Sequence, residues 1–183
     1  PEYVLALDSL NRVWGWGNNN SYMLGDGSNT TRYSPVLTNL ASLGSAKPVA
    51  LGAGYYHSLL LDDLGRLWTW GSGSYRMGIG NVSDSLLGRT PALVDNGALG
   101  ANKFIQMSAG YDHNLALDNT NRLFSWGYNS YGKLGLGDLS IQYVPAVVHM
   151  PAPRPTPIIK PEILAIRELM GPDEVVLVPL EIE

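Results

Sequence analysis

The strongest constraint on the fold of this chain is a segment that occurs three times. The aspartates Asp8, Asp62 and Asp118 are 54 and 56 residues apart. Internal repetition at such a period is typical of solenoid and propeller proteins, in which each repeat is one supersecondary unit. The residues that recur in register with the aspartates are Arg12, Arg66 and Arg122, and then Trp16, Trp70 and Trp126, followed by Gly17, Gly71 and Gly127.

Each repeated Asp and Arg enclose a short loop between two apolar strands. The position before the arginine is Asn11, Gly65 or Asn121. Glycine and asparagine tolerate positive φ best, so we expect this position to be the left-handed residue of a hairpin loop. An aspartate at the start of such a loop can accept hydrogen bonds from the loop amides. The repeated Asp, Arg and Trp-Gly residues are therefore interpreted as structural, not catalytic.

The strands of each repeat are apolar on both faces, which favours sheets stacked against sheets. The second repeat offers about four strands, at residues 50–52, 58–61, 66–70 and 91–94. Four-stranded sheets repeated at this period predict an all-β fold of the β-propeller type. Only Pro1 and Glu2 precede the first strand of the first repeat, so we expect that repeat to lack one strand.

The third copy shows most clearly which family the repeat resembles. Its run from residue 113 to residue 148, HNLALDNTNRLFSWGYNSYGKLGLGD and then VPAVV, is similar to the RCC1 (regulator of chromosome condensation) repeat. The resemblance covers roughly residues 3 to 148 and implies a β-propeller fold. The best-known member of that family is a nucleotide-exchange factor for a small nuclear GTPase, and its activity requires a whole ring with an inserted wedge loop. Three repeats without such an insertion do not imply that activity.

The domain organisation follows from the repeat and from the prolines after it. We expect three propeller repeats in residues 1–149, a Pro-rich linker at 150–161, and an assembly arm at 162–183 with a short helix and a terminal β-strand. The repeats themselves are expected at about 3–46, 47–101 and 102–149.

The tail raises three possibilities, because three repeats cannot close a ring of the usual four to eight blades. The tail could supply the strand that the first repeat lacks, or two copies could complete a ring together. Alternatively, the tail could bind a neighbouring protein as a strand or a docked helix. The hypothesis that we favour is assembly, because a closing strand should need only a short connection.

Composition narrows the classes of partner. A net charge of −4 and a pI of about 5.3 give no attraction for a polyanion, so we expect no nucleic acid. The chain has no cysteine, which excludes disulfides and thiolate sites. No apolar run is long enough to span a bilayer. We therefore expect protein partners, with the chain as a homo-oligomer or a component of a larger assembly.

The candidate partner-binding residues in the repeats include tyrosines in loops, because these side chains bury much area at a small entropic cost. They follow the Trp-Gly pairs, and the apolar residues of the tail add to them. The complete set is Tyr75, Arg76, Tyr128, Tyr131, Ile163, Ile166, Leu169, Val176 and Val178.

Catalytic chemistry finds little support in the sequence. His57 and His113 occupy equivalent repeat positions without a carboxylate at metal-ligand spacing, so we interpret them as hydrogen-bonded residues at the inner edge of a blade. The glycines of residues 132–138 lack the strand, loop and helix order of a phosphate-binding site. We predict no catalytic residue, no metal and no cofactor.

These observations predict a non-catalytic, RCC1-like protein-binding or architectural subunit that its C-terminal arm fastens to a larger assembly. Architecture alone favours an extracellular or virion-associated place over the cytoplasm. A fragment of an intracellular RCC1-like regulator of a GTPase or another protein is the main alternative. A propeller lyase or hydrolase is a further one.

Overall fold

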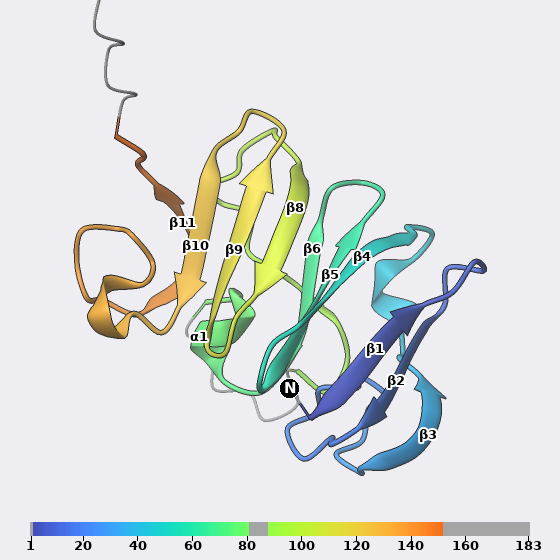
Figure 1. Cartoon of the computed structure of the whole chain (residues 1–183). Helices are drawn as coiled ribbons and strands as arrows, with labels where there is room; N and C mark the ends of the chain where they lie inside the picture. The colour runs from blue at the N-terminus through green and yellow to red at the C-terminus, as the bar shows by residue number, and fades with distance from the viewer. Residues whose placement is uncertain (1, 81–87, 152–183) are drawn as a thin grey trace, which may run out of the picture. The chain divides into compact units, whose positions relative to one another are not determined.

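The computed structural model describes residues 2–80 and 88–151 and contains three antiparallel sheets, one for each repeat (Figure 1). We call these sheets blade 1, blade 2 and blade 3 in chain order. The all-β fold predicted from the repeats is confirmed. Blade 1 has strands β1 (Tyr3–Leu7), β2 (Val13–Gly17) and β3 (Arg32–Leu37); blade 2 has β4 (Pro48–Ala53), β5 (His57–Asp62), β6 (Leu67–Gly71) and β7 (Ala92–Leu93); blade 3 has β8 (Phe104–Ala109), β9 (His113–Asp118), β10 (Leu123–Gly127) and β11 (Gln142–Val148).

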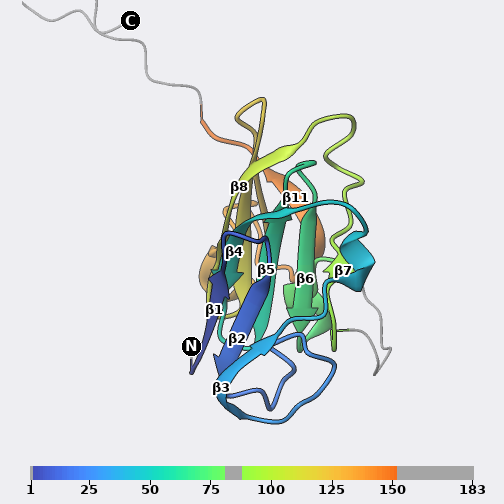
Figure 2. The same cartoon turned by 90° about the vertical axis from the view of Figure 1, so that its right-hand side faces the viewer.

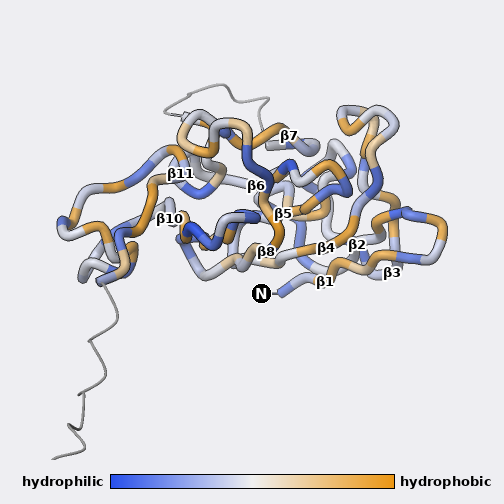
Figure 3. Tube along the Cα trace, turned by 90° about the horizontal axis from the view of Figure 1, so that it is seen from above, coloured by the Kyte–Doolittle hydropathy of each residue, from blue (hydrophilic) through white to orange (hydrophobic). Residues whose placement is uncertain are grey.

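The three blades form one compact unit, Pro1–His149, and Met150–Glu183 forms a second unit. Within the first unit the sheets lie one behind another (Figure 2), and Figure 3 shows apolar residues along their strands. A single helical turn, α1 (Ser74–Met77), follows β6, and short 3-10 turns occur at Ala41–Leu43 and Ser130–Gly132. None of the described helices is long and apolar enough to cross a membrane. The predicted arm at 162–183 and most of the predicted linker lie outside the described residues.

Blade 1 has three strands where the other two blades have four. The order is β1-β2-β3 in blade 1, β4-β5-β6-β7 in blade 2 and β8-β9-β10-β11 in blade 3. The strand that β4 and β8 provide has no counterpart before β1 in the described residues. The prediction of an incomplete first repeat is confirmed.

The hairpin loops are closed by the repeated aspartates. Asp62 Oδ1 accepts hydrogen bonds from the backbone N–H of Leu64 (3.0 Å) and of Arg66 (2.9 Å), and its Oδ2 accepts one from Arg66 Nε (2.7 Å). Trp68 Nε1 also donates to Asp62 Oδ2 at 2.9 Å. The residue before each arginine has positive φ as predicted, with 61° at Asn11, 77° at Gly65 and 63° at Asn121.

The same hydrogen bonds act on the aspartate pKa values. Burial raises the pKa of Asp118, but donation from the Arg122 backbone and side chain and from Thr120 outweighs burial and lowers the pKa to about 2. The pKa of Asp62 is also lowered, because donation from Trp68 and Arg66 outweighs the effect of burial. Both carboxylates are therefore anions at neutral pH, and they stabilise the hairpin loop by accepting its hydrogen bonds.

The core lies between the blades, where each face of blade 2 meets a neighbour. Leu59 and Leu61 pack with Phe124 and Trp126 of blade 3, whereas Leu60 packs toward blade 1 in a cluster that includes Val13, Leu43, Trp68 and Trp70. All six residues of β5 are buried for this reason, whereas buried and half-buried residues alternate along β9. Blade 3 therefore has one covered face and one face that no described residue covers.

The tryptophans of the second and third Trp-Gly pairs each connect their blade to the preceding one. Trp70 Nε1 donates to the carbonyl oxygen of Met23 at 2.6 Å, and Trp126 Nε1 donates to that of Arg76 at 3.1 Å. The approach needs a glycine two residues after each carbonyl: a Cβ on Gly25 would lie 2.9 Å from Trp70 Nε1, and one on Gly78 would lie 2.7 Å from Trp126 Nε1. The recurrence of the tryptophan and that of the glycine at Gly25 and Gly78 thus reflect the same contact between blades.

A candidate protein-binding surface at the blade junctions

The candidate site begins with two tight loops that share the sequence Ala-Gly-x-x-His. The backbone N–H of Gly54 donates to the His57 carbonyl at 2.9 Å, and that of Gly110 donates to the His113 carbonyl at 2.8 Å. The His57 ring folds back over Gly54, and a Cβ on that glycine would clash with it. The two residues between the glycine and the histidine therefore lie at the tip of the loop, and in the first loop both are tyrosines.

The histidine of the first loop faces the next blade. His57 Nε2 donates to Asn114 Oδ1 at 2.6 Å, and Asn114 Nδ2 donates to the Arg76 carbonyl at 2.7 Å. That carbonyl is also the acceptor of the Trp126 indole. Burial lowers the pKa of His57 to about 4, against a hydrogen bond to Asn114 that raises it. The imidazole is therefore neutral at pH 7 and carries its hydrogen on Nε2.

Tyr3 takes the place of this histidine between blades 1 and 2. Its hydroxyl donates to the His57 carbonyl at 2.6 Å and lies 2.8 Å from Ser58 Oγ, which donates to the Met23 carbonyl. Both junctions thus use a side chain from one blade, a polar side chain of the next blade and the carbonyl that accepts the indole. In the described residues no group of three or more His, Asp or Glu side chains could hold a metal ion.

The loop tips form a cluster of aromatic rings around a guanidinium. The ring centroids of Tyr55 and Tyr111 are 4.3 Å apart in a stacked arrangement, and those of Tyr55 and Tyr56 are 4.5 Å apart. Arg76 Cζ lies 4.4 Å from the centroid of Tyr75 and 5.0 Å from that of Tyr56. Contacts of this kind between a cation and the face of a ring are attractive and hold the guanidinium in place.

The cluster continues onto blade 3 through Tyr75 and Tyr128, whose ring centroids are 6.0 Å apart. Lys133 Nζ lies 5.4 Å from the Tyr128 ring and 2.8 Å from Asp112 Oδ1. We call the combined set the tyrosine surface, and it consists of Tyr55, Tyr56, Tyr75, Tyr111, Tyr128, Arg76 and Lys133.

The structure brings three of the predicted partner-binding residues together, namely Tyr75, Arg76 and Tyr128. Tyr131 is 99% exposed and makes none of the ring contacts found in the cluster. The apolar residues of the tail, Ile163, Ile166, Leu169, Val176 and Val178, lie outside the described residues. The prediction left out the loop-tip tyrosines and Lys133, although the position of Tyr55, Tyr56 and Tyr111 between glycine and histidine would have indicated them.

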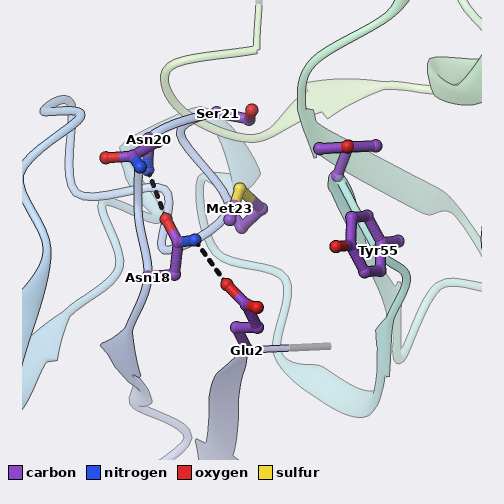
Figure 4. A pocket seen from close by; sticks show the side chains of 7 residues that line it. Glu2, Asn18, Asn20, Ser21, Met23 and Tyr55 are labelled. Carbon is purple, nitrogen blue, oxygen red and sulfur yellow. Dashed lines mark hydrogen bonds between the residues drawn. The ribbon is translucent and has the colours of Figure 1, made fainter.

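A pocket of about 190 Å³ adjoins the tyrosine surface between blades 1 and 2 (Figure 4). Glu2 and Asn18 form one wall, and Asn18 Nδ2 donates to Glu2 Oε2 at 2.9 Å. Tyr55 stands on the opposite side. The volume is below that of ordinary cofactor and drug-sized sites, which start near ~300 Å³. The full lining consists of Glu2, Asn18, Asn20, Ser21, Met23, Tyr55 and Tyr56.

Comparison with known proteins agrees with the repeat and the blades. The sequence pattern of the Regulator of chromosome condensation (RCC1) repeat matches residues 11–61, 65–117 and 120–160, and a second pattern for the same repeat matches 49–76 and 104–133. The chain belongs to the RCC1 repeat family. The resemblance inferred from the sequence is confirmed.

Curated relatives contain a similar segment within longer chains. The chain is similar to the Ultraviolet-B receptor UVR8 of Arabidopsis thaliana, with 30% identity over 82% of this chain and 33% of the receptor. It is similar to Protein pim1 of Schizosaccharomyces pombe, with 31% identity over 75% of this chain and 25% of that protein. The chain therefore spans a third or less of the length of these relatives.

Solved structures show the same fold. Human WBSCR16 matches with a TM-score of 0.72 and 28% identity, over 82% of this chain and 38% of its own. Yeast RCC1 (Prp20), solved with Kap60, matches with a TM-score of 0.69 and 24% identity, over 82% of this chain and 36% of its own. At that identity the yeast structure supports the fold alone.

The buried His57 predicts a loss of stability in mild acid. Its pKa is about 4 in the folded chain and 6.5 in the ordinary state, so the unfolded chain binds more protons between these values. Stability should be complete above pH 6.5 and should fall by about 3 kcal/mol as the pH drops to 4.

His57→Gln should flatten this part of the profile, and urea unfolding followed by circular dichroism at several pH values measures it. The aspartates with lowered pKa values lose their stabilising effect only below about pH 5, and this loss is common to the wild type and His57→Gln, so the difference between the two profiles reports on His57. Equal losses for the wild type and for His57→Gln between pH 6.5 and 4 would contradict the role of His57.

Proposed function

We propose that the chain is a non-catalytic protein-binding segment of an RCC1-like propeller and that partners bind at the tyrosine surface. The observation that supports this proposal is the continuous contact among five tyrosine rings and two cations across the edges of blades 2 and 3. No other part of the described chain gathers so many rings in mutual contact.

The physical case rests on what tyrosine and arginine do at interfaces. Both residues are enriched among the side chains that contribute most to binding energy, because they combine large contact area with directional polar groups. Tyr111 and Tyr128 are exposed, whereas Tyr55 and Tyr56 are partly buried by one another. A partner would thus meet rings that are already ordered, so ordering them costs little entropy on binding.

The surface also lies on a rigid support. The Arg76 carbonyl accepts hydrogen bonds from Trp126 and Asn114 in the buried junction, while the Arg76 side chain lies among the tyrosines. Loops that a rigid scaffold positions in this way are common sites of recognition.

The architectural role proposed from the sequence has its own support in the uncovered face of blade 3. His113, Leu115 and Leu117 are half-buried, but the equivalent His57, Leu59 and Leu61 of blade 2 are covered by blade 3. Gly135 corresponds to Gly25 and Gly78, yet a Cβ on it would meet only Val148 Cγ1, at 3.4 Å.

We propose that this face accepts blade 1 of a second copy, with Trp16 in the position that Trp70 and Trp126 occupy within the chain. Trp16 is half-buried where both counterparts are fully buried, so it has apolar area left to cover. Val4 occupies the repeat position of Ser58 and Asn114, which donate hydrogen bonds to the preceding blade. Because valine cannot donate one, the contact between two copies would depend on the Trp16 indole and on apolar packing.

The other hypotheses from the sequence stay predictions. One relative in the same fold, Prp20p of Saccharomyces cerevisiae, is described by its binding to Gsp1p and histones, and that description applies to Prp20p. Regulation of a GTPase, a propeller lyase or hydrolase activity, and an extracellular or virion-associated place rest on sequence architecture alone. The same holds for the C-terminal arm as a fastening segment.

Binding at the tyrosine surface predicts a sharp effect of two substitutions. Peptides selected from a phage-displayed random library against the whole chain should lose about 30-fold in affinity for a Tyr111→Ala, Tyr128→Ala double variant, which corresponds to ~2 kcal/mol. Biolayer interferometry measures the affinities.

Tyr33→Ala is the matched control, because Tyr33 is 98% exposed on β3 and lies outside the surface. The proposal fails when the selected peptides bind the double variant as well as they bind the wild type.

Self-association predicts different effects for two neighbouring glycines. Gly135→Ala should place a methyl group where the indole of Trp16 would approach. Gly137→Ala should not interfere, because a Cβ there would meet nothing within 4 Å. Both have positive φ, 69° and 83°, so the backbone strain of the two variants is comparable. Sedimentation velocity over a concentration series should show association for the wild type and for Gly137→Ala, but single chains for Gly135→Ala and Trp16→Ala. A wild type that sediments as single chains at every concentration is the result that excludes this contact.

A further inference from the structure

The pocket between blades 1 and 2 has a counterpart between blades 2 and 3 that the chain fills with its own arginine. From this pair we infer that the open pocket binds an arginine side chain of the partner. The inference rests on the proposed function, because it names the residue type that a partner of the tyrosine surface would insert.

The two junctions are equivalent position by position. The backbone N–H of Asn18 donates to the Glu2 carbonyl at 2.9 Å, and the N–H of Ser72 donates to the Tyr56 carbonyl at 2.8 Å. Glu2 and Tyr56 therefore hold the same place in successive blades.

The indole hydrogen bonds extend this equivalence. Met23 and Arg76 provide the carbonyls that accept the indoles of Trp70 and Trp126. The side chain of Met23 in the first junction therefore corresponds to that of Arg76 in the second. Tyr55 corresponds to Tyr111 by its place in the Ala-Gly-x-x-His loop.

In the second junction the guanidinium of Arg76 lies among residues of the equivalent region. It contacts the ring of Tyr56, which corresponds to Glu2, and the ring of Tyr75. Its Nη1 lies 3.4 Å from the carbonyl oxygen of Ser72, which corresponds to Asn18. The chain thus shows an arginine side chain accommodated in a site of this shape.

In the first junction the corresponding side chain is that of Met23, which is uncharged. Met23 lines a pocket of about 190 Å³, so an open space adjoins the position that Arg76 occupies in the second junction. A volume of this size suits one amino-acid side chain and not a larger ligand.

The walls of the pocket suit a cation. The Glu2 carboxylate lies on one side and the Tyr55 ring on the other (Figure 4). Asn18 donates to Glu2 Oε2, and Asn18 Oδ1 accepts from the backbone N–H of Asn20, so the amide that orients the carboxylate is itself held.

No Lys or Arg in the described residues lies within 4.0 Å of the Glu2 carboxylate. A partner's guanidinium would pair with the carboxylate and lie against the ring, a combination that favours arginine because its planar group can do both.

The test uses a blocked Gly-Arg-Gly tripeptide, with the same peptide carrying citrulline as an uncharged control of nearly equal shape. Amide NMR titration of the whole chain should show shifts at Asn18, Asn20 and Ser21 with the arginine peptide and at least about tenfold weaker binding of the citrulline peptide. Glu2→Gln should weaken the binding of the arginine peptide by a similar factor.

Two substitutions that exchange the residues of the two junctions make the test specific to this pocket. Met23→Arg should fill the pocket with the chain's own guanidinium and abolish binding of the arginine peptide. Arg76→Met should open a second pocket and add shifts at Ser72 and Ser74. Glu2→Gln leaves the core untouched and keeps the test decisive if Met23→Arg does not fold, which the thermal melting curve reveals.

Equal binding of the arginine and citrulline peptides, or unchanged binding by Glu2→Gln, would overturn the inference. The proposed function can survive that result, because the peptides selected on the tyrosine surface are tested by Tyr111→Ala and Tyr128→Ala. If the arginine peptide does not bind but the selected peptides still bind the tyrosine surface, the arginine pocket is wrong and the proposed function stands.

Discussion

The hydrogen bond from a tryptophan indole to a carbonyl of the preceding blade is the contact on which the rest of the structure depends. In both junctions the same carbonyl also accepts a second donor, Ser58 Oγ at Met23 and Asn114 Nδ2 at Arg76. Buried hydrogen bonds of this kind are directional, so they favour one arrangement of neighbouring blades. The apolar residues of β5 can then be buried on both faces at once.

The same contact explains how a structural repeat positions the tyrosine surface that we propose for partner binding. The indole and Asn114 hold the backbone at Arg76, and the turn of α1 leaves its side chain among the loop-tip tyrosines. In the first junction Met23 fulfils the backbone task equally well but leaves a pocket beside Tyr55. The two junctions therefore share their backbone contacts but differ in side chains, with Met23 and Glu2 in the first where Arg76 and Tyr56 stand in the second.

The sequence predicts the blades because their determinants are local and recur in register. Positive φ before Arg66, the carboxylate of Asp62 in the hairpin and the missing first strand all follow from residues close together in the chain. The surface was only partly predictable, because the tyrosine rings of Tyr55 and Tyr111 come from repeats 56 residues apart. The second repeat is also one residue shorter after its Trp-Gly pair, which hides the correspondence of Arg76 with Met23 until the indole contacts are known.

Hydrogen exchange of the indole N–H groups tests the central contact most directly. Of the five tryptophans, Trp70 and Trp126 should exchange as slowly as the most protected backbone amides, because their donors are buried in the junctions. The indole of Trp16, which has no preceding blade in the described residues, should exchange near the rate of a solvated indole in samples dilute enough to contain single chains. Fast exchange at Trp70 and Trp126, or equal protection at Trp16, would contradict the account.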